Sequence, residues 1–263
     1  MIKKSQLLSA AILVLLLGSC KENLKENEVI DHDTPPKTET PIKDDKPLET
    51  VKPASTGFGG IWLNRKYVDR LIATQSPKKS QDITPITMLV LPDDFNKEAT
   101  VIISFHEGAT GKVFKKDKGY QINYADSNEP PFSFDLDKRG IKSENDEFVK
   151  LKSSGNKNDF RIADQLLFAG KYDLNGKQVE FSTNGKVTGL DAFSYYSVLI
   201  DYYDAGMQVD QIRLGKNAEE SKLYGFTFKN DTLSIYELKC VDGDADFCDV
   251  VKLGKKLYQL KKK

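Results

Sequence analysis

The stretch Gly170–Leu190, GKYDLNGKQVEFSTNGKVTGL, decides the fold because it contains two closely spaced Asn-Gly pairs. Asn175-Gly176 and Asn184-Gly185 each separate segments in which polar and apolar residues alternate. Asn and Gly tolerate the positive φ that both central residues of a type I′ turn require, so this pair is a strong hairpin signal. The stretch therefore predicts three short antiparallel strands joined by two tight turns.

Alternation continues from this stretch to the C-terminus. In SYYSVLIDYYD, a period of two places four residues on one face, namely Tyr196, Val198, Ile200 and Tyr202. The next strand segment, LYGFTFK, places Phe226 and Phe228 on a common face, and TLSIYELKC and KLYQLK follow it as strand candidates. Turn signals recur about every ten residues, as in an antiparallel sandwich or barrel.

The first half of the folded region mixes strand segments with two short helical ones. GIWL at residues 60–63 predicts a strand, and NRKYVDRLIATQ at residues 64–75 predicts a short helix that Ser76-Pro77 ends. Five further strand segments lie between residues 82 and 137, and residues 158–168 favour a short helical turn. The predicted fold class is all-β: an antiparallel up-and-down meander, a β-barrel with one or two short helices.

Composition divides the chain into three segments. Residues 1–19 have a basic start and a short apolar run, the layout of a secretory signal peptide. Residues 20–56 hold five of the ten prolines and no aromatic residue, so they cannot bury enough apolar surface to fold and predict a disordered tether. Residues 57–263 hold every Phe, Tyr and Trp. Their length suits one large domain or two small ones, and we expect one β-barrel domain.

The end of the signal segment resembles a bacterial lipobox, Leu17-Gly18-Ser19-Cys20. The resemblance implies that the thiol of Cys20 is lipidated and anchors the protein to a membrane. In bacterial lipoproteins an Asp directly after the cysteine is associated with retention in the inner membrane. This chain has Lys21 at that position. We therefore expect a lipid-anchored protein of the outer membrane. The sequence does not indicate on which face of that membrane it lies.

Gly60-Ile61-Trp62 carries a second resemblance, to the lipocalin-like (calycin-type) proteins of the bacterial envelope. A G-x-W on the first strand, followed by an antiparallel meander, is typical of that family. Its fold is a barrel that holds an apolar ligand, with a basic residue of the last strand across the Trp. Gly170-Lys171-Tyr172 resembles a second such opening.

The resemblance implies a set of ligand-binding residues on the inner faces of the strands. Aromatic residues also fill ordinary β cores, so packing without a ligand stays open. The predicted set is Trp62, Tyr196, Ile200, Tyr202, Phe226 and Phe228.

Cys240 and Cys248 flank seven residues that predict a hairpin loop. Exported compartments are oxidising and a redox-active pair has C-x-x-C spacing, so we expect a structural disulfide. Asp242, Asp244 and Asp246 match the start of a calcium loop, but Phe247 stands where the loop needs Gly. We interpret the loop as a polar hairpin tip.

Motifs for other chemistry are missing from the sequence. The two histidines, His32 and His106, cannot form a His-rich zinc site, and neither a nucleophile elbow nor a phosphate-binding loop occurs. With 39 basic and 39 acidic residues, the chain lacks the positive charge of a nucleic-acid binder. We expect no enzyme, no cofactor and no metal ion.

Two functions fit these observations. The first is binding of a small hydrophobic or amphipathic ligand in a barrel cavity. The second is a protein-interaction module with a filled core, which docks another envelope protein through its surface.

Overall fold

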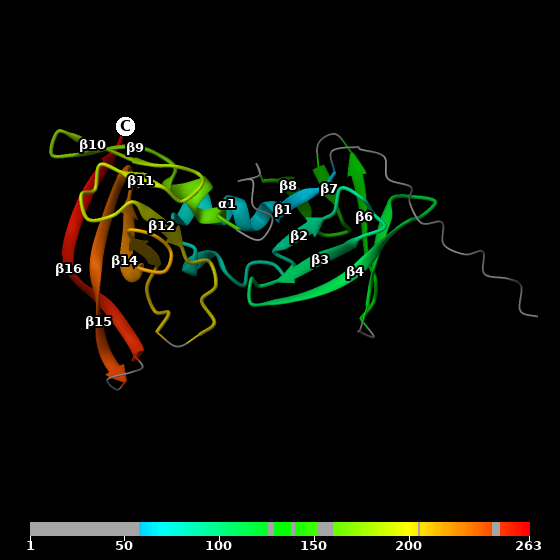
Figure 1. Ribbon diagram of the computed structural model, residues 1–263. Coiled ribbons are helices and arrows are strands. Elements are labelled where there is room, and N and C mark those ends of the chain that lie inside the picture. Colours follow the sequence, from blue (N-terminus) through cyan, green and yellow to red (C-terminus); the bar gives the residue numbers. More distant parts are fainter. Residues whose placement is uncertain (1–57, 126–128, 138–139, 152–159, 205, 244–247) are drawn as a thin grey trace, which may run out of the picture. The chain divides into compact units, whose positions relative to one another are not determined.

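The computed structural model describes residues 58–125, 129–137, 140–151, 160–204, 206–243 and 248–263 (Figure 1). The strands pair with antiparallel neighbours in two eight-stranded sheets, so the protein is all-β with an up-and-down meander, as predicted. The predicted signal peptide, Cys20 and the tether lie outside the described residues.

The first sheet is a closed barrel in which each strand pairs with the next and β8 pairs with β1. Its strands are β1 (Gly60–Asn64), β2 (Met88–Leu91), β3 (Glu98–Ile103), β4 (Glu107–Lys115), β5 (Tyr120–Tyr124), β6 (Phe132–Asp137), β7 (Gly140–Lys142) and β8 (Glu147–Lys150).

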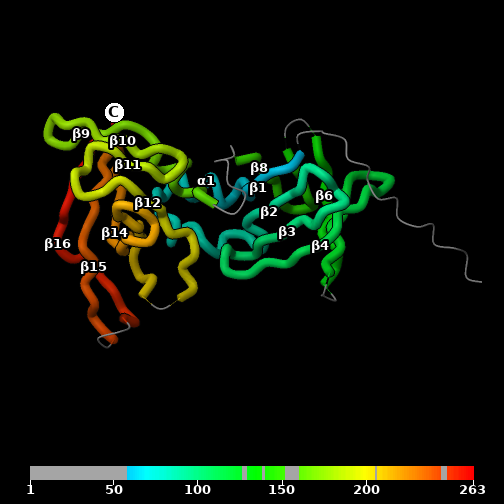
Figure 2. Tube along the Cα trace, in the orientation of Figure 1, coloured from blue at the N-terminus to red at the C-terminus, as the bar shows by residue number. Residues whose placement is uncertain are grey.

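The second sheet is also a meander, ordered β11-β10-β9-β16-β15-β14-β13-β12 (Figure 2). Its strands are β9 (Gly170–Leu174), β10 (Lys177–Phe181), β11 (Val187–Thr188), β12 (Tyr195–Val198), β13 (Gln211–Gly215), β14 (Lys222–Lys229), β15 (Thr232–Gly243) and β16 (Cys248–Lys262). One isolated bridge, Lys186 to Tyr195, joins its two outer strands, so this sheet is barrel-like.

The predicted helix at residues 64–75 is α1 (Arg65–Thr74). Its apolar residues Tyr67, Val68 and Leu71 are spaced three or four apart and are buried, as an amphipathic helix requires. After the short 3₁₀ helix η1 (Lys78–Ser80), the remaining helical element is η2 (Asp164–Phe168), a five-residue π-helix inside the segment where the sequence favours a helical turn.

The two Asn-Gly turns differ in the structure. Asn175 and Gly176 both have positive φ, 53° and 88°, as a type I′ turn requires. In the second turn only Gly185 has a positive φ. This turn is a longer loop, in which the Ser182 N–H bonds to Lys186 O and the Gly185 N–H bonds to Ser182 O.

Two expectations differ from the observed topology. We expect one barrel over residues 57–263, whereas the strands form two sheets because β8 returns to β1 and Gly170 opens a second meander. We also expect residues 194–204 to form one strand, whereas β12 ends at Val198. Its partner β13 begins at Gln211, so the ladder has no partner strand beyond Leu199.

Candidate functional site

Five of the six predicted ligand-binding residues fall in two separate hydrophobic clusters. Trp62 belongs to the cluster inside the first barrel. Tyr196, Phe226, Phe228 and the half-buried Ile200 belong to or pack against the other cluster, which lines the second sheet and also includes residues of α1, β1 and β2. The structure therefore does not bring Trp62 together with the other five residues.

The interior of the second sheet is filled by Phe168 from η2. This ring is fully buried and contacts four aromatic rings edge-on or tilted. The distances between ring centroids are 4.9 Å to Phe226, 5.2 Å to Phe228, 5.7 Å to Phe181 and 6.0 Å to Tyr196. Three of the predicted ligand-binding residues thus pack on the chain's own side chain.

Tyr202, the last of the predicted set, is buried outside the strands. Its hydroxyl accepts a hydrogen bond of 2.8 Å from the Gln211 main-chain N–H. This bond orients the Tyr202 side chain at the start of β13.

Aromatic rings also run through the interior of the first barrel. Phe95 contacts Tyr120, which stacks on Phe134, and Phe134 in turn stacks on Phe132, with centroid distances of 5.6, 5.6 and 5.9 Å. Phe132 meets Phe148 edge-on at 6.0 Å. The interior of a small barrel is filled by such side chains or holds one small ligand.

The first strand of each sheet carries the same pair of contacts, a hydrogen bond and a lysine over an aromatic ring. The Trp62 indole N–H donates to Phe58 O at 2.9 Å, and the Tyr172 hydroxyl donates to Phe168 O at 2.8 Å, each four residues back. A lysine of the last strand lies over each ring: Lys150 Nζ is 5.5 Å from the Trp62 ring and Lys262 Nζ is 5.8 Å from the Tyr172 ring.

The two first strands also match in sequence, over a longer pattern than G-x-W. Phe58-Gly59-Gly60-Ile61-Trp62 and Phe168-Ala169-Gly170-Lys171-Tyr172 share Phe, Gly and a large aromatic residue at the same spacing. The matching contacts indicate that the two sheets are structural repeats.

A buried ion pair lies where the two outer strands of the second sheet, β11 and β12, meet. The side chains of Arg161 and Asp164 are only 8% and 1% exposed, and their closest atoms are 3.3 Å apart. Arg161 Nη1 donates to Tyr196 O at 2.8 Å, and Asp164 Oδ2 accepts from the Val198 N–H at 3.2 Å. Because β11 has only two residues, these side chains satisfy main-chain groups of β12 that a longer strand would pair.

Gly185 makes room for this pair. A Cβ at Gly185 would overlap the Arg161 guanidinium, and its φ of +83° disfavours other residues. The sequence alone gives no sign of the pair, since Arg161 and Asp164 lie outside the strand pattern.

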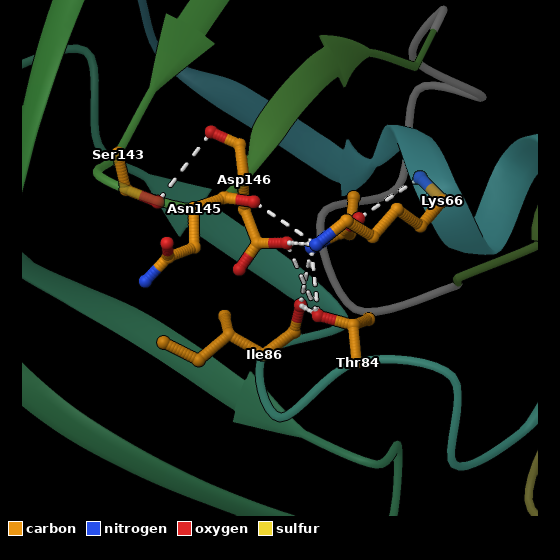
Figure 3. A network of polar contacts seen from close by, with 7 residues as sticks. Lys66, Thr84, Ile86, Ser143, Asn145 and Asp146 are labelled. Atoms are coloured by element: carbon orange, nitrogen blue, oxygen red, sulfur yellow. Dashed lines mark hydrogen bonds and ion pairs between the residues drawn. The ribbon is translucent and has the colours of Figure 1, made fainter.

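A polar network ties the start of α1 to the first barrel (Figure 3). Asn64 Oδ1 accepts from the Lys66 N–H at 2.9 Å, and Asn64 Nδ2 donates to Thr84 Oγ1 and Ile86 O at 3.0 Å each. Lys66 Nζ lies 2.9 Å from Asp146 Oδ1. Burial raises the pKa of Asp146, but hydrogen bonds from Asn64 and Lys66 outweigh it and hold this pKa below its usual value.

A shallow cleft of about 260 Å³ lies next to this network, lined by Arg65, Gly140, Ile141, Lys142, Glu147 and Phe148. Its volume is below the roughly 300–1,000 Å³ of typical ligand sites. Glu147 already binds both cations of the cleft, at 2.7 Å from Lys142 Nζ and 3.4 Å from Arg65 Nε. The cleft is therefore small for a ligand, and the charges of Arg65 and Lys142 are already paired with Glu147.

The long hairpin of β15 and β16 carries the predicted cysteine pair. Cys240 and Cys248 lie at disulfide-bonding distance, with Cα atoms 5.8 Å apart, as predicted. Pairing between β14 and β15 ends at Gly225 and Tyr236. Figure 1 shows β15 and β16 continuing together past β14, and we call residues 237–243 and 248–256 the ribbon.

The outer edge of β16 is covered by a side-chain amide. Gln208 Nε2 donates to Asp249 O at 3.0 Å, and Gln208 Oε1 accepts from the Val251 N–H at 2.9 Å. The Gly206 N–H also bonds to Asp249 O, at 2.8 Å. Gln208 thus takes the hydrogen-bonding place of a neighbouring strand.

His106 forms an exposed hydrogen-bonded pair with Asp201. Its Nδ1 lies 3.0 Å from Asp201 Oδ2, and the two side chains are 42% and 37% exposed. The nearby Tyr203 hydroxyl bonds to the side chains of Asp82 and Ser104. The hydrogen bond to Asp201, followed by the charge of that carboxylate, raises the pKa of His106.

Replacing Asp201 with asparagine should return the pKa of His106 toward the usual value of about 6.5. Since the folded-state pKa is raised, the pair stabilises the fold fully below that value and loses its contribution as pH rises through the folded-state pKa. NMR titration of the imidazole tests this, with Glu107→Gln as a control. Glu107 is the weakest of the causes, so a larger decrease in that variant would contradict the assignment.

Within the described ranges, no helix is long and apolar enough to cross a membrane, and no three His, Cys, Asp or Glu side chains gather as metal ligands would. Two of the three aspartates of the calcium-loop motif, Asp244 and Asp246, lie outside those ranges, and so does His32.

Comparison of the chain with protein-family models, with curated proteins and with solved structures gives no match.

Proposed function

We propose that this protein is a protein-interaction module, held at the outer membrane by a lipid on Cys20, which docks another envelope protein through the ribbon. The observation that carries the proposal is the aromatic packing inside both sheets, centred on Phe168 in the second. A small barrel is filled by its own side chains or holds one ligand, and aromatic packing inside both sheets favours a role for the protein surface.

The ribbon has the properties of a docking element. It extends past β14, a cysteine pair closes its end, and Gln208 binds the main chain of Asp249 and Val251 next to that closed end. Val241 is 54% exposed, more than any other large hydrophobic side chain in the described part of the chain. Contiguous exposed apolar side chains mark protein-interaction sites, so Val241 counts together with the apolar face of the ribbon.

The ribbon suits docking by its face rather than by strand addition. Register shifts flank Asp242, and Lys239 stands directly opposite Lys252. Bulges and lysines are the features that protect a strand edge from pairing with another chain.

One face of the ribbon is apolar. Leu238 pairs with Leu253 and Cys240 with Val251, so these four side chains share a face. The two leucines lie over Gly225, where a Cβ would meet both of them. This surface would contact an apolar patch of the partner.

A photo-crosslinking amino acid at Val241 should give an adduct of discrete mass in cells that make the full-length protein. The matched control is the same amino acid at Ile72 in α1, which is 53% exposed against 54% for Val241. The proposal expects the adduct at Val241 alone. Adducts of equal yield at both positions, or none at Val241, would contradict docking through the ribbon.

A further inference from the structure

Tyr67 differs from the other buried tyrosines in its hydroxyl. Tyr172 and Tyr196 donate to main-chain carbonyl oxygens at 2.8 and 2.6 Å, and Tyr202 accepts from a main-chain N–H. The Tyr67 side chain is fully buried, yet its hydroxyl has no hydrogen-bond partner among the described residues. Buried polar groups in native proteins are paired with protein atoms or with ordered water, so this one requires an explanation.

Polar groups from two parts of the chain gather near this hydroxyl. Burial, and then the negative charge of Asp210, raises the pKa of both Tyr67 and Tyr202. The Tyr202 hydroxyl also bonds to the N–H of Gln211, the residue next to Asp210, so it lies in the same region as the Asp210 side chain. The Tyr202 hydroxyl is the acceptor in its bond to Gln211, so its own proton is available to a second partner.

Asp210 is held in place by the segment after α1. Its Oδ2 accepts from Ser76 Oγ at 2.5 Å, and its Oδ1 accepts from the Lys78 N–H at 2.9 Å. Each carboxylate oxygen has a second lone pair, which leaves the group able to accept a further bond. The site therefore combines two buried hydroxyl donors with one half-buried acceptor.

We infer that one ordered water molecule occupies the position between the Tyr67 hydroxyl, the Tyr202 hydroxyl and the Asp210 carboxylate. It accepts hydrogen bonds from both tyrosines and donates one to Asp210. About three bonds to otherwise unsatisfied groups is the usual number for a buried water. The water is a structural ligand that links α1 to the segment before β13, independently of the proposed function.

The sign of the effect of Tyr67→Phe on stability tests this inference. If the water is present, losing the hydroxyl deprives it of a partner, and the unfolding equilibrium constant rises roughly tenfold. If the hydroxyl is unsatisfied, its removal relieves a cost, and the constant falls or stays unchanged. Tyr172→Phe, which loses a direct bond to Phe168 O, is the matched control and should raise the constant in either case.

A high-resolution crystal structure of the full chain separates the water from a direct bond. The inference expects density for a water within hydrogen-bonding distance of the Tyr67 and Tyr202 hydroxyls and of Asp210. Tyr67 bonded directly to the carboxylate, or an empty site with a stabilised Tyr67→Phe variant, would overturn it.

Discussion

Replacing Phe168 with alanine should destabilise the second sheet by about 3–5 kcal/mol, the usual cost of removing a buried phenylalanine ring. The ring contacts Phe181, Tyr196, Phe226 and Phe228, which come from three different strands. Its removal leaves a void that these neighbours cannot fill without leaving their strand positions. Urea denaturation followed by circular dichroism measures the loss.

Two variants calibrate this result. Phe168→Leu keeps part of the volume and should cost less, whereas Ile72→Ala shortens a side chain that is 53% exposed and should cost little. If Phe168→Ala costs less than about 1 kcal/mol, the ring does not fill the interior and the case for a packed core fails.

Replacing Asp164 with alanine should cost about 3–5 kcal/mol, because it removes the carboxylate that lies 3.3 Å from the buried Arg161 guanidinium. It also removes the acceptor of the Val198 N–H, so β12 loses a bond at the seam of the second sheet. Thermal or urea unfolding measures the loss, and hydrogen exchange at Val198 should accelerate.

The pair Lys177–Asp191 provides the control on the protein surface. Its atoms are 2.6 Å apart, closer than those of Arg161 and Asp164, but its side chains are 50% and 92% exposed. Asp191→Ala should therefore cost less than about 1 kcal/mol. Equal losses in Asp164→Ala and Asp191→Ala would contradict the assigned role of burial.

Local patterns predict the elements of this fold well. The φ angles at Asn175-Gly176 depend on those two residues, so the sequence suffices to place that hairpin. Likewise, the i, i+4 spacing in residues 64–75 predicts α1, and the cysteine spacing predicts the closed end of the ribbon.

Long-range packing explains what the sequence does not predict. Period-two alternation places Tyr196, Phe226 and Phe228 on inner faces, but it does not reveal that Phe168 occupies the space between them. The Arg161–Asp164 pair depends on β11 being too short to pair fully with β12. The two sheets differ from one barrel because strand partners, which the pattern leaves open, decide where a meander closes.

The central claim is that both sheets are filled by their own side chains, so that the protein acts through its surface. Native mass spectrometry of residues 57–263, exported to an oxidising periplasm and purified without detergent, tests it most directly. The intact mass would be recorded before and after organic extraction. The account predicts the bare polypeptide mass less two hydrogens for Cys240–Cys248 in both spectra. A discrete additional mass that disappears on extraction would contradict it and establish a bound ligand.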